Sequence, residues 1–306
     1  MSDSSSRLIR SLPLIGGLLL FLSALALFLY GTRVETRRFR LEKLRLALGQ
    51  NKGAATKSAY DEKLRILHIS DLHLRDSDQK KVDFIRAITD DDFDLVVLTG
   101  DIFQFSQGLD FAPFLLSRKP RLGAYAVFGN HDYFDYSLVN KTIGRIFPKM
   151  RTPDARKDIT PLRRALEGGG FTVLVNEAVT LAEPNIFIVG VDYPGIKDDA
   201  LAALMQDAPA NALKLALFHL PWKLAQLASA GFDLVFGGHT HGGQIRLPGF
   251  GALITDSELG RSEASGLLRR DNTYFHISRG LGADPRSNLR LFCPPAATVI
   301  EINRKL

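Results

Sequence analysis

The sequence predicts an α/β domain that follows one N-terminal transmembrane helix. From residue 64 onward, short apolar runs alternate with amphipathic stretches, the pattern of strands and helices in turn. The 306 residues are 45% hydrophobic and 24% charged, so the chain can bury a substantial core and general disorder is excluded. A nearly unbroken apolar run at residues 12–30 precedes this domain.

Cysteine content and charge distribution exclude further classes of protein. Cys293 is the only cysteine, so a disulfide framework and a cysteine-based zinc site are both excluded. The formal charge of +6 is unevenly placed, because residues 1–58 hold ten Lys and Arg against three acids, whereas residues 59–306 hold 29 against 30. Since the domain itself is nearly neutral, we expect no nucleic-acid partner.

The apolar run has the length of a membrane span. No charged residue lies between positions 11 and 32, and a helix of that length measures roughly 33 Å, close to the hydrocarbon core of a bilayer. A buried core helix is one alternative, although such helices are usually amphipathic and shorter. Another is a signal peptide cleaved after Ala24-Leu25-Ala26, which would leave the apolar Leu27–Tyr30 at a new terminus. We expect residues 1–32 to form a tail and an uncleaved anchor.

Basic residues flank this segment unequally. Two arginines precede it, whereas six basic residues follow it, namely Arg33, Arg37, Arg38, Arg40, Lys43 and Arg45. The positive-inside rule therefore predicts a single-pass protein of the inner (cytoplasmic) membrane whose domain faces the cytoplasm. Residues 33–58 are expected to be a basic juxtamembrane segment and linker, either solvated or drawn to an anionic leaflet, and residues 59–306 the folded domain.

The elements of the domain are predicted in chain order. The expected strands are Leu64–Ser70, Leu95–Thr99, Ala124–Phe128, Ile186–Val191, Leu213–Phe218, Leu234–Phe236, Tyr274–Ile277 and Thr298–Ile302. Helices are expected around Lys80–Ile88 and Trp222–Ala228. Helical patterns become rare after Gly242, which indicates antiparallel strands that close a second sheet.

Polar groups follow five of these strands directly. They are Asp71-Leu72-His73, Gly100-Asp101, Gly129-Asn130-His131-Asp132, His219, and Gly237-Gly238-His239-Thr240-His241. Each is commonplace alone, as a turn or a helix cap. Ligands bind at the carboxyl ends of strands in open α/β sheets, so the ordered set is expected to converge on one rim. His68 and His276 lie within strands and are interpreted as ordinary strand histidines.

This ordered set resembles the calcineurin-like metallophosphoesterases, from about Leu64 to about Ile302. The phrases Ile69–Leu74, Gly238–Ile245 and Ser278–Gly282 are similar to the membrane-associated branch of that family. This branch contains bacterial envelope phosphodiesterases and the alternative UDP-2,3-diacylglucosamine hydrolase of lipid A synthesis. The resemblance implies two mixed β-sheets packed as a sandwich with helices outside.

The resemblance also implies a dinuclear metal site and the role of each residue. One ion is expected on Asp71, His73, Asp101 and His241, and the other on Asp101, Asn130, His219 and His239. Asp101 is expected to bridge the ions because a carboxylate has two oxygens. Mn²⁺ is the favoured metal, with Fe, Zn or Ni as alternatives, because the ligands mix imidazole and oxygen. His131 is expected to act on the leaving oxygen, with Asp132 orienting it and Arg279 contacting substrate.

Two positions depart from the family pattern. Tyr193 stands where relatives often carry an acid, and Ala296 follows Pro294-Pro295 where many have glutamate. Neither position is an expected ligand, but both weaken assignment to one subgroup. The favoured substrate is UDP-2,3-diacylglucosamine, hydrolysed to UMP and 2,3-diacylglucosamine 1-phosphate. A general envelope or nucleotide phosphodiesterase and a membrane-tethered non-catalytic scaffold remain alternatives, and the oligomeric state is not predicted.

A segment at about residues 134–162 is longer than the family pattern needs. Eight Lys and Arg lie between Lys141 and Arg164, against two acids. A helix over Leu138–Met150 would gather apolar side chains on one face and suit an anionic leaflet. The segment is expected to contact lipid and substrate through Lys141, Arg145, Ile143, Ile146 and Phe147. A surface helix packed on the domain is the alternative.

Overall fold

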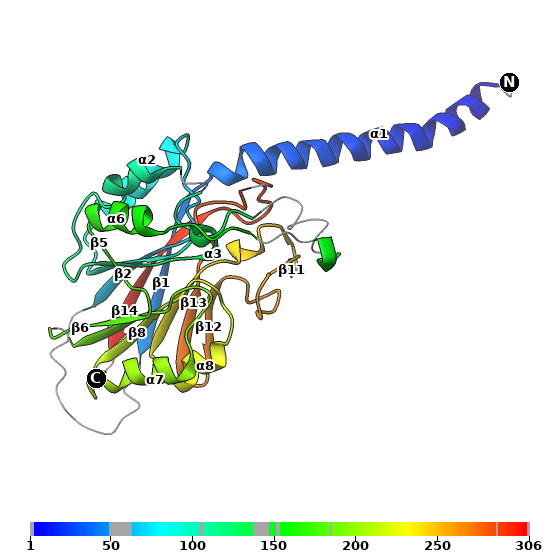
Figure 1. Cartoon of the computed structure of the whole chain (residues 1–306). Helices are drawn as coiled ribbons and strands as arrows, with labels where there is room; N and C mark the ends of the chain where they lie inside the picture. Colours follow the sequence, from blue (N-terminus) through cyan, green and yellow to red (C-terminus); the bar gives the residue numbers. More distant parts are fainter. Residues whose placement is uncertain are drawn as a thin grey trace.

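Two six-stranded mixed sheets form the centre of the domain in the computed structural model (Figure 1). The structure describes residues 3–48, 63–104, 107–136, 147–150, 154–183, 185–285 and 287–304. The first sheet has the order β1 (Arg40–Leu48), β14 (Ala296–Arg304), β2 (Leu64–Ile69), β3 (Leu95–Thr99), β4 (Ala124–Val127) and β5 (Phe171–Val173). The second has the order β12 (Gly266–Arg270), β13 (Thr273–Ile277), β9 (Leu234–Gly237), β8 (Leu213–Leu217), β7 (Ile186–Gly190) and β6 (Glu177–Leu181). The predicted fold class is confirmed.

The sheets pack face to face, because alternate residues of each strand point to opposite faces. In β3, Leu95 and Val97 join the core between the sheets, whereas Val96 and Leu98 join the core beneath the helices of the first sheet. That outer core includes residues of α2 (Gln79–Thr89) and α6 (Thr160–Gly168), and the outer core of the second sheet includes α7 (Asp198–Gln206) and α8 (Leu224–Ser229). The result is four layers.

Most predicted strands begin and end within about two residues of the observed ones, and the expected helices correspond to α2 and α8. The C-terminal strands differ from expectation in part. β12 and β13 are antiparallel to each other, as predicted, but β13 pairs in parallel with β9, and β14 joins the first sheet instead of the second. The four strands β2, β3, β4 and β5 are parallel, so their carboxyl ends share one edge.

Residues 40–48 are a correction to the sequence analysis. They were expected in a juxtamembrane linker, whereas they form β1, which pairs in parallel with β14 from Arg40 opposite Ala296 to Leu48 opposite Arg304. The physical reason is the alternation of Leu44, Leu46 and Leu48, which pack against the core between the sheets. The basic residues among them dominate the composition and conceal this pattern. Strand β1 therefore ties the segment after the apolar helix into the domain.

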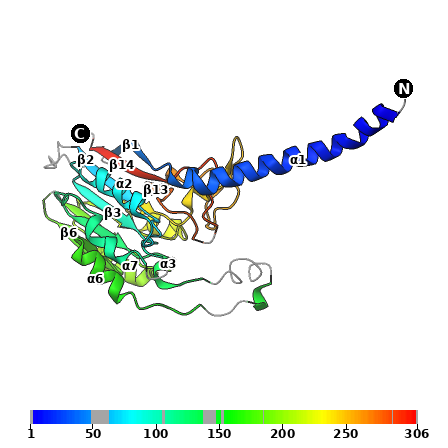
Figure 2. The same ribbon diagram turned by 90° about the horizontal axis from the view of Figure 1, so that it is seen from above.

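The apolar segment forms α1 (Asp3–Arg33), which extends away from the domain (Figures 1 and 2). Among the described residues it is the one helix that is long and apolar enough to cross a membrane. The predicted helix over Leu138–Met150 lies mainly outside the described residues, as do Lys141, Ile143, Arg145 and Ile146 and the predicted linker near residues 50–58. Of this segment, Pro148–Met150 form the 3-10 turn η3, and Phe147 is exposed.

Candidate metal centre

The predicted polar groups converge where strands of both sheets end. Asp71 follows β2, Asp101 follows β3, and Asn130 begins the short helix α3 (Asn130–Tyr133) after β4. From the second sheet, His219 follows β8 and His239 follows β9. The seven expected metal ligands therefore lie together, although they are distributed over 171 residues of sequence from Asp71 to His241.

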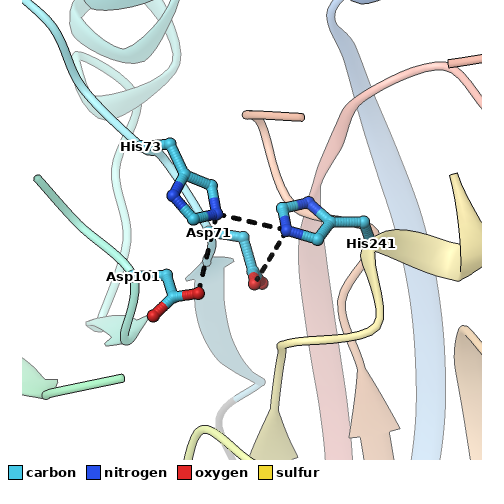
Figure 3. A group of neighbouring side chains, drawn as sticks. All are labelled: Asp71, His73, Asp101 and His241. Atoms are coloured by element: carbon cyan, nitrogen blue, oxygen red, sulfur yellow. Dashed lines mark hydrogen bonds and ion pairs between the residues drawn. The ribbon is translucent and has the colours of Figure 1, made fainter. Parts of the chain in front are cut away.

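The first ligand group consists of Asp71, His73, Asp101 and His241, all buried, whose ligand atoms lie within 4.8 Å of one another (Figure 3). His73 Nε2 lies 3.2 Å from His241 Nε2 and 3.6 Å from Asp101 Oδ2. His241 Nε2 lies 3.7 Å from Asp71 Oδ1. The carboxylates and the ring nitrogens thus face a common point.

The second ligand group consists of Asp101, Asn130, His219 and His239. His219 Nε2 lies 3.3 Å from Asp101 Oδ2 and 3.1 Å from Asn130 Oδ1. His239 Nδ1 lies 2.9 Å from Asn130 Oδ1 and 3.3 Å from His219 Nε2. The same oxygen of Asp101, Oδ2, faces both groups, because Oδ1 accepts the backbone N–H of His131 at 2.7 Å. A single oxygen, and not both as expected, is therefore directed at the two groups.

Neighbouring acceptors determine where the ring protons lie in the neutral histidines. His219 Nδ1 donates to the carbonyl of Thr99 at 2.8 Å, and His73 Nδ1 donates to Gln104 Oε1 at 2.9 Å. In each neutral ring, Nε2 then carries a lone pair and no proton, and this lone pair points toward the other ligand atoms of its group. Ligand bonds of about 2.0–2.1 Å put two nitrogens on one ion about 3.0–3.4 Å apart, which matches the 3.2 Å between His73 and His241. The donor set therefore fits two cations.

Burial and charge shift the protonation of the metal-free cluster. Burial raises the pKa of Asp71 to about 6 and lowers that of His239 to about 4. Burial also favours the neutral ring of His219, but the charge of Asp101 and its hydrogen bond raise the pKa of His219 to about 9. For Asp101, the charges of His219 and His131 outweigh burial and hold the pKa well below its ordinary value. Without metal, a proton on His219 thus balances Asp101.

Five of the seven ligands have left-handed backbone conformations. The φ angles are 49° at Asp71, 43° at His73, 51° at Asp101, 70° at His239 and 50° at His241. Residues other than glycine seldom adopt this region, and such strain concentrates at functional sites. It turns each side chain inward at the point where its strand ends.

Two glycines allow the loops to approach each other closely. A Cβ on Gly238 would lie 2.1 Å from Ser70 Oγ and 2.5 Å from Asp71 Oδ2. A Cβ on Gly129 would lie 2.3 Å from Asp101 Oδ1. A larger side chain at either glycine would collide with the neighbouring loop, so glycine is required before both Asn130 and His239.

His131 and Asp132 lie beside the cluster. The His131 ring packs edge-on against His73, with 4.9 Å between ring centroids, and it is a member of neither ligand group. Asp132 accepts backbone N–H bonds from Gly129 at 2.8 Å and Ile102 at 2.9 Å, and burial raises its pKa to about 7. Its carboxylate thus connects the loops that carry Asp101 and His131.

Arg279 lies next to the cluster but is already paired. Its Nη1 lies 3.0 Å from Glu42 Oε1 of β1, and its Cγ is 3.1 Å from the Cβ position of Gly242. The expected substrate contact would compete with this ion pair.

A buried hydrogen-bond chain supports Asp71 and was missed in the sequence. His276 Nδ1 and His68 Nδ1 lie 2.8 Å apart, His68 Nε2 is 2.8 Å from Thr99 Oγ1, and Thr99 donates to Ser70 Oγ at 2.7 Å. Ser70 in turn donates to Asp71 Oδ2 at 2.6 Å. Because that carboxylate only accepts, each donor points toward Asp71 when both rings are neutral.

Gln104 and Arg290 were also missed. Gln104 holds the ring of His73, and the fully buried Arg290 donates to the carbonyls of Arg279, Gly282 and Cys293. The only sequence signal was the position of Gln104 three residues after Asp101. Arg290 carried no signal, because a buried arginine satisfied by backbone carbonyls is defined by the fold alone.

Comparison with known proteins agrees with this geometry. The profile of the calcineurin-like phosphoesterase family matches residues 64–243. The chain is 30% identical over 283 residues to the uncharacterized metallophosphoesterase YkoQ of Bacillus subtilis, covering 90% of this chain and 94% of that protein. It is 31% identical to the phosphodiesterase YaeI of Escherichia coli, covering 68% and 70%. It is 29% identical to the UDP-2,3-diacylglucosamine pyrophosphatase LpxG of Chlamydia muridarum, covering 80% and 85%.

A profile match over more than half of the chain and a relative of similar length at 30% identity lead to one assignment. The chain belongs to the calcineurin-like phosphoesterase family and is a metal-dependent phosphoesterase.

Proposed function

We propose that this protein is a membrane-anchored dinuclear hydrolase that cleaves a phosphodiester or pyrophosphate bond. The observation that carries the proposal is the pair of ligand groups that share Asp101 Oδ2, with the Nε2 atoms of His73 and His219 directed into them. One cation is held by Asp71, His73, Asp101 and His241, and the other by Asp101, Asn130, His219 and His239. When bound, such a metal pair stabilises charge on phosphoryl oxygens and makes water more acidic.

The chain itself supplies orientation and proton transfer. Thr99 and Gln104 hold His219 and His73 with their Nε2 atoms directed inward, so neither ring has to turn when the site is filled. His131 lies beside the first group without belonging to it, and its imidazole donates a proton or a hydrogen bond to the leaving oxygen. Asp132 keeps the backbone around His131 in place.

Mn²⁺ is the metal we favour, because the cluster combines imidazoles, carboxylates and an amide oxygen. Fe, Zn and Ni accept the same donor types. The four ions are ranked by loading the metal-free protein with each and measuring turnover. The highest turnover with Mn²⁺ would support this choice, and a higher turnover with another ion would contradict it.

The favoured substrate is UDP-2,3-diacylglucosamine, cleaved to UMP and 2,3-diacylglucosamine 1-phosphate. Similarity to LpxG over 80% of the chain and the exposed apolar helix α1 support an acylated substrate. Similarity to YaeI supports the second candidate, a general envelope or nucleotide phosphodiesterase. The complete set of seven ligands argues against a non-catalytic scaffold.

A cleft beside the second ligand group suits the nucleotide part of this substrate. It runs from His219 to Trp222 and Lys223 and is bounded on the other side by residues 191–196. Trp222, the only tryptophan, is half-exposed there and offers a flat face to a base. If UMP binds in this cleft, its addition to the full-length chain quenches tryptophan fluorescence, whereas ribose 5-phosphate does not; equal responses to both would remove the base from the proposal.

The proposed location is the inner membrane, with α1 as a retained anchor and the domain in the cytoplasm. The excess of basic residues after α1 supports this orientation. A C-terminal reporter that is active only in the cytoplasm tests it, and mass spectrometry tests whether the N-terminus is intact. A mature terminus at Leu27 would replace the anchor with a signal peptide.

The substrate is tested by incubating the purified full-length chain with Mn²⁺ in mixed micelles containing UDP-2,3-diacylglucosamine, and separately with bis-p-nitrophenyl phosphate and p-nitrophenyl phosphate. We expect release of UMP, abolished by a chelator and restored by Mn²⁺. Hydrolysis of the simple diester without UMP release would favour the general phosphodiesterase. Hydrolysis of none would favour the scaffold.

A further inference from the structure

The base of α1 is fixed to the loop that precedes β14. The carbonyl of Gly31 accepts the backbone N–H of Arg290 at 3.2 Å, and a Cβ on Gly31 would lie 2.5 Å from Leu289 Cδ1. The buried carboxylate of Glu35 accepts the N–H of Cys293 at 2.7 Å. The base of α1 is therefore fixed to this loop of the domain and is not joined to the domain through a free linker.

The same loop is hydrogen-bonded to the start of a hairpin in another loop, the one after β9, formed by β10 (Arg246–Leu247) and β11 (Gly251–Ala252). Leu291 donates to the carbonyl of Gln244 at 2.9 Å, and Arg246 donates to the carbonyl of Leu291 at 3.0 Å. In Figure 1 the hairpin lies on the side of the domain from which α1 extends. The hairpin begins a few residues after the ligand His241, so one short stretch joins the metal centre to the place where α1 emerges.

Large apolar side chains are exposed at this place. Phe250 is 50% exposed, Ile254 59% and Phe292 52%, and Leu247 and Leu253 are also exposed. We call these five residues the apolar rim. Outside α1, they account for five of the eleven exposed large apolar side chains among the described residues. Backbone hydrogen bonds from Phe250 to Leu247, from Leu253 to Ile245 and from Arg246 to Leu291 hold their segments together. Phe292 also has a φ of 53°, a strained backbone that turns an aromatic ring outward.

One arginine packs on the apolar rim, and two more are exposed at the base of α1. The guanidinium of Arg261 lies over the ring of Phe250, 4.3 Å from its centroid. Arg33 and Arg37 are exposed at the base of α1. Apolar tips among basic residues are typical of surfaces that enter the headgroup region of an anionic bilayer. The apolar rim lies at the base of a helix that is long and apolar enough to cross a membrane. A lipid surface explains this position, whereas a protein partner does not.

We propose that the apolar rim inserts into the headgroup region of the bilayer that α1 crosses, so that the metal centre is held at the membrane surface. The occupant of this face is the lipid leaflet, and the substrate class is an amphipathic phosphoester whose acyl chains stay in the leaflet. The inference rests on the proposed anchoring by α1. Beyond anchoring, the inference states that one defined face of the domain contacts the membrane, so that the domain is not connected to it only through a flexible linker.

Depth-dependent fluorescence quenching tests the docking without any assay of activity. Single cysteines at Phe250→Cys, Leu20→Cys and Glu183→Cys are labelled with an environment-sensitive dye in the full-length chain in liposomes of neutral and anionic phospholipid. The wild-type chain, whose cysteine is buried, serves as the blank. We expect a shallow lipid quencher to reach position 250, a deep quencher to reach position 20 in α1, and neither to reach position 183 in the exposed turn after β6.

The outcomes separate the two proposals. Quenching at position 20 but not at position 250 would overturn the docking while leaving the anchor intact. Lack of quenching at position 20 would overturn the anchor itself, and with it the docking proposal.

A matched pair of substitutions links docking to substrate. Phe250→Ser removes an aromatic ring of the rim, and Phe114→Ser removes a ring that is 48% exposed at the end of the 3-10 helix η2 (Leu109–Phe114), where the guanidinium of Arg86 lies over it. We expect Phe250→Ser to lower hydrolysis of the diacyl substrate in vesicles about tenfold, because the variant loses the free energy of burying one aromatic ring in the bilayer. Hydrolysis of bis-p-nitrophenyl phosphate is expected to stay unchanged. Equal loss on both substrates, or equal effects of the two variants, would show that the rim has only a structural role.

Discussion

The two ligand groups share Asp101 but are supported in different ways. In the first, side chains hold the ligands: the adjacent Ser70 bonds Asp71, and Gln104, 31 residues away, bonds His73. In the second, a backbone carbonyl holds His219, and His239 is only partly buried. The cleft that includes Trp222 opens on this second side. We infer that the first group is the tighter metal site and the second the one that exchanges metal and meets the polar part of the substrate.

The largest effect is expected where the two groups meet. Asp101→Ala removes the oxygen that faces both, so metal content falls from about two per chain toward zero and activity is lost with it. Mass spectrometry of bound metal after gel filtration measures this. Asp91→Ala, a surface carboxylate bonded to Arg65, is the control and keeps both ions. One fully occupied ion remaining in Asp101→Ala would show that the groups are independent.

The next effect separates chemistry from metal binding. His131→Ala leaves both ligand groups intact, and turnover falls roughly 10²–10⁴-fold if the imidazole transfers a proton. The ratio of metal to protein is measured on the same sample. A parallel loss of metal and rate would identify His131 as a ligand.

A smaller effect distinguishes the groups directly. His68→Phe breaks the chain that ends on Asp71, so the affinity of the first group for Mn²⁺ falls about 10–100-fold. The second group, whose support does not include His68, keeps its affinity. Calorimetric titration resolves the two, and thermal unfolding shows whether the variant is folded. His68→Gln, which still offers an N–H toward Thr99, restores part of the loss, whereas equal weakening at both groups would contradict the assignment.

The smallest effect is a proton released at the second group. The pKa of His219 is raised to about 9 in the metal-free protein, so its ring is mainly protonated at pH 7–8 and must lose this proton to bind a cation. Affinity of the second group therefore rises with pH up to about 9 and then levels off. Calorimetry at pH 8 in buffers of different ionisation enthalpy measures the proton, and heats that are independent of buffer would contradict the assignment.

The strand pattern brought the candidate residues to one rim, whereas the family resemblance supplied their roles as metal ligands. Asp71, Asp101 and His219 needed only the strand pattern and the edge rule for parallel sheets to be placed together. Gln104 and the pair His68–His276 could not be predicted, because their roles depend on contacts between elements that are distant in sequence.

The side of the domain beside α1 was harder to predict. In β1, charged residues masked the alternation of Leu44, Leu46 and Leu48. The apolar rim was missed because Leu247 and Phe250 are unremarkable in a sequence and become a surface only beside α1. The predicted lipid contact through Ile143, Ile146 and Phe147 stays a prediction.

Titration of the metal-free full-length chain with Mn²⁺, with bis-p-nitrophenyl phosphate hydrolysis followed at each addition, tests most directly whether the two groups act as one dinuclear centre. We expect little hydrolysis while the first equivalent fills the group of His73 and His241, and a steep rise as the second fills the group of His219 and His239. Full activity at one equivalent per chain would contradict the dinuclear centre.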